Sequence, residues 1–411
     1  MTAPMKWVNT LSRRASLEAA IDEVVEQARE QLSESADLGL LFISSAFASE
    51  YSRLMPLLHE KLEIGTLIGC SGGGIIGMNA AHEAEELEEE PALSLTLAHL
   101  PEVQVHGFHL DGEALPDLDS PPDRWMECIG VSAADRPQFV ILADPFSAKI
   151  NDLLAGLDFA YPGATKVGGL ASSGAGGNTT ALFCNRQMYR EGSVGVALSG
   201  NLVLESIVAQ GCRAIGQPYR VKECDRNIIL QLEDVQDRSA PVTPLDALRE
   251  LIQSLDSSDR ELAQHSLFVG VARDEFKLEL ERGDFLIRNL LGVDPRVGAI
   301  AIGDRIRPGQ RIQFHLRDAN TSAEDLEMLL ERYKREIGAS SSSPRHVGAL
   351  LFSCLGRGAR LYGEAHFDSR LFARYFDIPL GGFFCNGEIG PVGDGTFLHG
   401  YTSVFGICRQ P

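Results

Sequence analysis

The stretches LLFISS (Leu40 to Ser45) and IGCSGGG (Ile68 to Gly74) decide the fold, because their pattern recurs twice more along the chain. Each copy begins with a short apolar strand, continues through a helical stretch and ends in a glycine-rich segment. The later copies run from FVILADP (139–145) to VGGLASSGAGG (167–177) and from ALLFSC (349–354) to LGGFFCNGEIG (380–390). Repetition at this scale indicates duplicated supersecondary units that share a core.

The spacing within the three copies is nearly constant. It is 28 positions from Leu41 to Gly69, 28 from Val140 to Gly168 and 31 from Leu350 to Gly381. Glycine allows a backbone or a ligand to approach closely. We therefore expect three similar glycine-rich loops, at Gly69, Gly168 and Gly381, that line one pocket.

Composition limits the classes of function. The 411 residues carry a net charge of −20, with 44% hydrophobic and 23% charged residues, as in an ordinary globular protein. Partners with a phosphate backbone or an anionic surface need a basic protein face, so nucleic acid and membrane are not expected partners. The acidic run EAEELEEE, from Glu83 to Glu90, reads as a solvated helix end or loop.

The spacing of the cysteines and the N-terminal sequence indicate the cellular compartment. Of eight cysteines, the closest two are Cys212 and Cys224, so no CxxC zinc or redox pattern exists. The first residues, MTAPMKWVNTLSRR, lack the features of a signal peptide, and no apolar run reaches the roughly 20 residues that span a bilayer. We expect a cytoplasmic protein.

Strands outnumber helices, and several strands follow one another without a helix between them. This pattern predicts a mixed α/β (α+β) fold with large, partly antiparallel sheets flanked by helices and containing the repeated strand–helix–Gly-loop module. Polar residues and two prolines in DVQDRSAPVTP (234–244) interrupt the pattern. We therefore expect two domains, residues 37–240 and residues 241–400.

Several matches to known sequence motifs do not indicate a function. Gly72, Gly74 and Gly77 satisfy the dinucleotide string G-x-G-x-x-G, but no following strand ends in a clear acidic residue. Ser71 stands in a G-x-S-x-G string, which also arises by chance where glycine is dense. No P-loop string occurs, and the histidines show no metal-ligand spacing, so we expect no metal site and no cofactor.

The segment with the most reactive side chains is Cys385-Asn386-Gly387-Glu388 in the third copy, which combines a thiol with a carboxyl group. A catalytic role for the thiol needs a neighbouring base, and none is visible in the local sequence. Three interpretations stay open for this turn: a nucleophile at Cys385, a loop that Glu388 supports by accepting backbone N–H groups, and a ligand contact through Glu388.

At this third copy the chain resembles the FIST family of sensory proteins. The run GGFFCNGEIGP (381–391) resembles the closing signature of the C-terminal FIST region, and residues 285–294 and 306–319 resemble earlier blocks of it. LLFISSAF, LIGCSGGGIIG and KVGGLASSG resemble parts of the N-terminal FIST region. The resemblance covers about residues 37–400.

The resemblance implies a role in sensing small ligands, with amino acids as one candidate class. It also carries an alternative, because some bacterial members of the family are described as haem-based nitric oxide sensors. The family occurs in bacterial signalling proteins and in an F-box adaptor. This chain shows no kinase, methyl-accepting or F-box region, so its output requires a separate, unknown protein partner.

Our hypothesis is a stand-alone small-ligand sensor that is not an enzyme. Its ligand-binding residues would be Glu388, Gly387, Asn386, Cys385, Gly381, Gly69, Ser71 and Gly168. The first alternative is the haem-based gas sensor. The second is a hydrolase or transferase that uses Cys385 or Ser71.

The net charge yields the first prediction. At about 150 mM salt, random-sequence duplex DNA should bind with a dissociation constant weaker than micromolar, because a chain at −20 without a basic run cannot neutralise phosphates. Fluorescence polarisation of a labelled duplex measures this affinity. Micromolar binding at that salt concentration would contradict the prediction.

Overall fold

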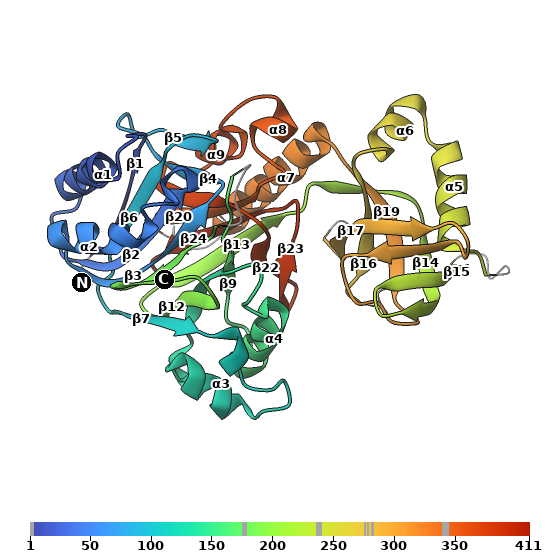
Figure 1. Cartoon of the computed structure of the whole chain (residues 1–411), viewed down its shortest axis with the longest axis horizontal. Coiled ribbons are helices and arrows are strands. Elements are labelled where there is room, and N and C mark those ends of the chain that lie inside the picture. Colours follow the sequence, from blue (N-terminus) through green and yellow to red (C-terminus); the bar gives the residue numbers. More distant parts are fainter. Residues whose placement is uncertain are drawn as a thin grey trace. The chain divides into compact units, whose positions relative to one another are not determined.

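A computed structural model describes residues 4–174, 179–235, 241–274, 277, 279–280, 283–338 and 345–411 of the chain. The chain forms two compact units (Figure 1). Residues 1–209 and 327–411 form the first, called here the large unit, and residues 210–326 form the second, called the barrel unit. The domain boundary that we expect from the sequence, between residues 240 and 241, separates two regions of sequence rather than these two compact units. It stays a prediction.

The first sheet of the large unit carries the first copy of the module. Its six strands are, in order across the sheet, β1 (Lys6–Ser12), β6 (Leu93–His99), β2 (Ala36–Ser44), β3 (Ile64–Gly72), β10 (Leu182–Cys184) and β11 (Gln187–Tyr189). Two helices, α1 (Leu17–Gln31) and α2 (Tyr51–Lys61), pack against one face of it (Figure 1). The hydroxyl of Ser16 caps α1 by accepting a hydrogen bond from Ala19 N.

The second sheet carries the second copy and takes two strands from the C-terminal part of the chain. Its order is β23 (Gly395–His399), β22 (Glu388–Val392), β9 (Lys166–Leu170), β8 (Gln138–Ala143), β12 (Ser193–Gly200) and β7 (Val103–Leu110). Helices α3 (Pro122–Ile129) and α4 (Ile150–Ala160) cover its outer face. Short 3₁₀ turns span Ser45–Phe47, Gly112–Ala114 and Ala133–Asp135.

The third sheet carries the third copy and takes two strands, β4 and β5, from the first 88 residues. Its order is β13 (Val203–Ala209), β24 (Ser403–Arg409), β20 (His346–Cys354), β21 (Leu380–Cys385), β4 (Gly74–Met78) and β5 (Ala84–Glu88). Helices α8 (Ala359–Tyr362) and α9 (Phe367–Ala373) connect β20 to β21, and α7 (Ala319–Gly338) precedes β20. The second and third sheets therefore each combine strands from distant parts of the chain.

One apolar core joins the three sheets. Alternate residues of the first strand in each module enter it, among them Phe42 of β2, Leu142 of β8 and Phe352 of β20. The intervening residues, such as Leu41, face the outer helices. The ring of Phe42 stacks on that of Phe383 at 5.0 Å between centroids, which packs the first sheet on the third.

The barrel unit is a closed barrel of six strands. Around the barrel they are β14 (Cys212–Asp225), β15 (Ile228–Asp234), β18 (Ala299–Ile302), β17 (Phe285–Asp294), β16 (Leu267–Ala272) and β19 (Arg311–Arg317). Helices α5 (Pro244–Ser254) and α6 (Ser257–Ala263) belong to the same unit. The mixed α/β fold with large, partly antiparallel sheets is thus confirmed.

Each module is a parallel strand–helix–strand unit, with β2 beside β3, β8 beside β9 and β20 beside β21. The strands of each pair approach so closely that one position must be glycine. A Cβ atom on Gly168 would lie 1.8 Å from the carbonyl oxygen of its partner Ile141. The corresponding distances are 2.2 Å for Gly69 and 1.9 Å for Gly382.

Two expectations about local structure were wrong. Gly69, Gly168 and Gly381 lie inside strands β3, β9 and β21 rather than in loops, because they allow close packing within the sheets. The acidic run is also no solvated helix end or loop. Its residues Ala84–Glu88 form β5, and Glu86 is only 2% exposed. Pairing with β4 overrides the preference of glutamate for solvent.

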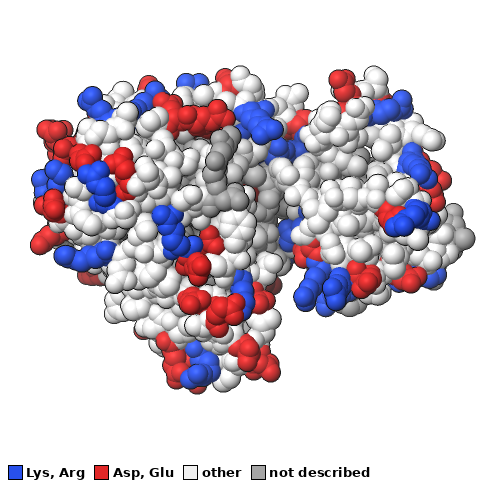
Figure 2. Space-filling model, viewed as in Figure 1, with Lys and Arg blue, Asp and Glu red and all other residues white. Residues whose placement is uncertain are grey.

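On the face that Figure 2 shows, acidic and basic side chains of the described residues are interspersed. No broad basic patch covers the described part of the large unit in this view.

The strand contact at Gly168 yields the second prediction. Gly168→Ala should lower the free energy of unfolding by at least about 2 kcal/mol, because the added methyl group overlaps a backbone oxygen that cannot move aside. Chemical unfolding measures this change. Gly400→Ala is the control, since a Cβ there would meet nothing within 4 Å. Equal stability of the two variants would contradict the prediction.

Candidate functional site

The carboxyl ends of the three parallel strand pairs meet at Ser172. Its backbone N–H donates to the carbonyl oxygen of Ser71, at the end of β3, over 3.1 Å. Its hydroxyl accepts from Gly73 N at 2.8 Å and donates to the carbonyl oxygen of Phe384 in β21. One side chain thus joins a residue from each module. Carboxyl ends of parallel strands are the usual place for ligands in α/β sheets.

We call residues 71–74, 170–174 and 384–388 the strand-end cluster. Two backbone hydrogen bonds join Leu170 to the turn at residues 386–387. Leu170 N donates to Gly387 O at 2.8 Å, and Asn386 N donates to Leu170 O at 3.1 Å. Gly174 N donates to the hydroxyl of Ser45 at 3.0 Å. Gly73, Gly174 and Asn386 are half-buried or exposed, so part of the cluster reaches the surface.

Of the eight predicted ligand-binding residues, the structure gathers five in this cluster: Ser71, Cys385, Asn386, Gly387 and Glu388. The other three, Gly69, Gly168 and Gly381, lie earlier in their strands and are buried. A Cβ on Gly381 would lie 2.5 Å from the amide nitrogen of the Asn9 side chain, so this glycine faces protein.

Glu388 opens β22 and is fully buried. Its Oε2 accepts a hydrogen bond from Thr402 N at 3.0 Å, and its backbone pairs with Gly169 and His399. The carboxylate therefore lies against the backbone of Thr402. In this structure it supports the backbone near β24, and its contact with a ligand stays a prediction.

Cys385 does not have the environment of a reactive thiol. Burial raises the pKa of Cys385 well above its usual range, and the neighbouring Glu388 carboxylate raises this pKa further. Nucleophilic cysteines have lowered pKa values, because the thiolate is the reactive form. The geometry therefore disfavours the alternative of a transferase or hydrolase that uses Cys385.

The hydroxyl of Ser71 is engaged with the backbone. It donates to the carbonyl oxygen of Ser172 and accepts from Ala181 N, both at 3.1 Å. A nucleophilic serine needs a base within hydrogen-bond reach, and among the described residues the Ser71 hydroxyl forms no hydrogen bond with an imidazole. Ser71 thus joins strand ends in this structure.

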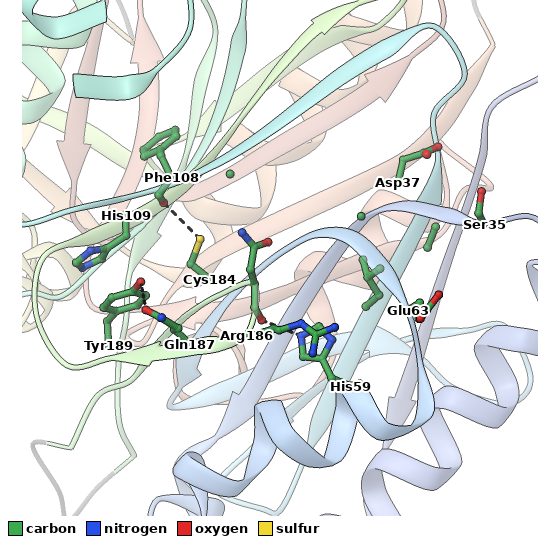
Figure 3. A pocket seen from close by; sticks show the side chains of 15 residues that line it. Ser35, Asp37, His59, Glu63, Phe108, His109, Cys184, Arg186, Gln187 and Tyr189 are labelled. Atoms are coloured by element: carbon green, nitrogen blue, oxygen red, sulfur yellow. Dashed lines mark hydrogen bonds between the residues drawn. The ribbon is translucent and has the colours of Figure 1, made fainter. Parts of the chain in front are cut away.

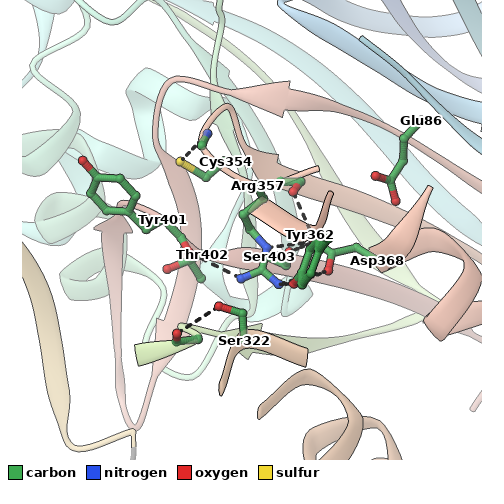
Figure 4. Close-up of polar contacts among 12 residues, drawn as sticks. Glu86, Ser322, Cys354, Arg357, Tyr362, Asp368, Tyr401, Thr402 and Ser403 are labelled. Atoms are coloured by element: carbon green, nitrogen blue, oxygen red, sulfur yellow. Dashed lines mark hydrogen bonds and ion pairs between the residues drawn. The ribbon is translucent and has the colours of Figure 1, made fainter. Parts of the chain in front are cut away.

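A buried ion pair that sequence reasoning missed joins Arg357 to Asp368 (Figure 4). The guanidinium of Arg357 donates to both carboxylate oxygens of Asp368, at 2.8 and 3.0 Å, and neither side chain is more than 1% exposed. The hydroxyls of Tyr362 and Ser403 also donate to Asp368, at 2.9 and 2.6 Å. Burial would raise the pKa of Asp368, but the Arg357 charge and these hydrogen bonds outweigh it and lower this pKa.

Three consecutive residues connect this ion pair to Glu388. The carbonyl oxygen of Tyr401 accepts from Arg357 at 3.5 Å, Thr402 N donates to Glu388, and Ser403 donates to Asp368. Both buried carboxylates therefore hold the same short segment before β24. No sequence motif marks this hydrogen-bond network, because its members are spread from 5 to 46 positions after Arg357.

Glu86 of β5 is a third buried carboxyl group. Its Oε1 accepts from Ser369 N at 2.7 Å, whereas its Oε2 is buried without a hydrogen-bond partner among the described residues. Burial raises the pKa of Glu86 to about 8, and the nearby charge of Asp368 contributes in the same direction. Near neutral pH, Glu86 therefore holds a proton while Asp368 stays ionised against Arg357.

Opposite the carboxyl ends, the first sheet borders a cavity of about 820 Å³ (Figure 3). It is lined by the amino ends of β2 and β3 and by residues 184–189, with Asp37, Glu63 and Arg186 as charged side chains. His59 Nε2 lies 3.0 Å from Asn185 O, and the His109 ring stacks on Tyr189 at 3.6 Å. The predicted ligand-binding residues do not line this cavity.

Comparison with known protein families identifies the chain. The FIST N domain matches residues 37–235, and the FIST C domain matches residues 244–391. This protein belongs to the FIST family. FIST domains are sensory domains that bind small ligands. The strand-end cluster combines residues of the FIST N match, such as Ser172, with residues of the FIST C match, such as Glu388.

The mycobacterial relatives of this FIST protein match nearly its whole length. An uncharacterised protein of Mycobacterium tuberculosis is 36% identical over 401 residues, which is 96% of each chain. An uncharacterised protein of Mycobacterium bovis is 32% identical over 398 residues, 96% of this chain and 95% of the other. An F-box/LRR-repeat protein of Arabidopsis thaliana is 27% identical over 176 residues, 37% of this chain and 33% of that protein.

Two further findings concern the described part of this FIST protein. No helix there combines the length and apolar character that crossing a bilayer requires. In the same part of the chain, no group of three or more His, Cys, Asp and Glu side chains is arranged to hold a metal ion.

The raised pKa of Glu86 yields the third prediction. Between its ordinary pKa of 4.5 and about 8, the folded chain binds one proton more than the unfolded chain. This contribution to stability is complete below pH 4.5 and is lost as the pH rises through 8. Wild-type protein should therefore lose stability relative to Glu86→Gln, which stays neutral, by up to about 1.4 kcal/mol per pH unit.

Urea unfolding of the wild type and Glu86→Gln at pH 5, 6.5 and 8 measures this difference. Glu83→Gln is the control, because Glu83 precedes the same strand but is exposed. An identical pH dependence of the wild type and Glu86→Gln would show that Glu86 ionises normally.

Proposed function

We propose that this protein is a non-catalytic sensor that binds a small ligand at the strand-end cluster and signals through a separate protein partner. The observation that carries the proposal is the meeting of three strand ends at Ser172. It places short backbone segments of all three modules beside one another. Backbone groups and a few polar side chains typically orient small ligands.

The charge of the cluster favours a ligand with a cationic group. Glu388 supplies a carboxyl group directly after the Asn386–Gly387 turn, and Arg357, the nearby cation, is already bound by Asp368. Glu388 is buried, where the effective dielectric constant is far below that of water, so a cationic group of the ligand would stabilise the ionised form of this carboxyl group. Amino acids, whose ammonium group fits this requirement, are the first candidates.

A thermal-shift screen against amino acids and common metabolites tests the proposal, since a ligand that binds only the folded state raises the melting temperature. The absorption spectrum of the same purified protein tests the haem alternative, which requires a Soret band. A thiol-reactive or serine-reactive probe tests the enzyme alternative. Labelling of Cys385 or Ser71 in the folded protein would contradict a purely binding function.

The fourth prediction concerns Glu388. For a cationic ligand found in the screen, Glu388→Gln should weaken binding by about 1–2 kcal/mol, the effect of one charge across several ångströms of protein. Titration calorimetry measures the affinity. Asp394→Asn is the control, because it removes one exposed carboxylate from the turn between β22 and β23. Equal affinity of the two variants would rule out Glu388 as the anchor.

A further inference from the structure

A second cavity, of about 450 Å³, lies between the β4–β5 hairpin and helix α9 in the large unit. Its floor is apolar. Phe372 and Leu380 are 1% exposed and Phe376 is 8% exposed, and all three line it. A cavity of this size with an apolar floor is typical of sites for small organic molecules. None of the predicted ligand-binding residues lines it.

Two arginines stand at the rim of this cavity. Arg370 and Arg374 lie four positions apart along α9 and its C-cap, so their side chains leave the same helix face. Both are exposed, and neither forms an ion pair or a side-chain hydrogen bond within the described part of the chain. Two adjacent guanidinium groups without carboxylate partners form a binding site for a planar anion.

The acidic residues of the rim do not neutralise this arginine pair. Glu85 is bound to Arg13 at 2.9 Å and accepts from the side chain of Asn79 at 3.0 Å. Glu83 and Asp377 are exposed and belong to other segments, the hairpin and the chain after α9. Within the described part of the chain, none of these three carboxylates forms an ion pair with Arg370 or Arg374, so both guanidinium groups can bind an anion.

We propose that this cavity binds a small amphipathic carboxylate, whose apolar body lies on Phe372, Phe376 and Leu380 and whose anionic group binds Arg370 and Arg374. The site is separate from the strand-end cluster and takes the opposite charge. One lining residue, His366, accepts a hydrogen bond from Glu86 N at 2.8 Å, so the cavity wall touches the network of buried carboxyl groups.

A pair of probes with the same apolar body tests the charge requirement. 3-Phenylpropanoate should bind the full-length protein and raise its melting temperature, whereas 3-phenylpropanamide should bind at least tenfold more weakly. Titration calorimetry measures both affinities. Equal affinity for the two compounds, or no binding of the carboxylate at 10 mM, would overturn the proposal.

Variants locate the binding. Arg370→Gln and Arg374→Gln should each weaken 3-phenylpropanoate at least fivefold, and both are exposed, so the fold should persist. Arg360→Gln on α8 is the matched control, because Arg360 is an exposed arginine outside the cavity. If the double variant at positions 370 and 374 has the same affinity for 3-phenylpropanoate as Arg360→Gln, the probe binds elsewhere and the proposal fails. Glu388→Gln should leave this affinity unchanged, which separates the two sites.

Discussion

The architecture of the large unit depends on the hydrogen bonds of Ser172. Its N–H and its hydroxyl connect β3, the segment after β9, and β21, which belong to three different sheets. Without such bonds, the backbone groups at the strand ends would be buried without partners, at a cost of about 1–3 kcal/mol each. The cluster that we propose as the ligand site is therefore also a junction of the fold.

Buried charges accompany this junction. Arg357 with Asp368, in the connection between β20 and β21, and Lys166 with Asp158, beside the second sheet, place cations of at most 1% side-chain exposure against carboxylates at 2.8 Å. Burying such pairs costs desolvation energy that their attraction only partly offsets. Their hydrogen bonds fix short backbone segments in one arrangement, as Asp368 and Arg357 do for residues 401–403. We interpret them as elements that position the strand ends.

Much of the fold could be predicted from the sequence, because the three modules repeat within short stretches of chain. The spacing from Leu41 to Gly69 corresponds to a real pairing of β2 with β3. The loop assignment failed at Gly69, Gly168 and Gly381, because a glycine that lets two strands approach looks the same in sequence as a glycine in a turn.

The site could be predicted only in part. The segment from Cys385 to Glu388 stands out by its local composition, and the structure places it in the strand-end cluster. The buried pair of Arg357 and Asp368 could not be predicted from the sequence. Charged residues are usually exposed, and these two are buried only because strands from distant parts of the chain pack around them. Glu86 was concealed in the same way, because five neighbouring glutamates made its segment look solvated.

Hydrogen–deuterium exchange with and without a ligand from the thermal-shift screen tests the central claim most directly. Our account predicts slower exchange in peptides from all three modules, covering residues 71–74, 170–174 and 384–388. Protection confined to residues 59–65 and 184–189, which line the cavity at the opposite ends of the strands, would contradict it.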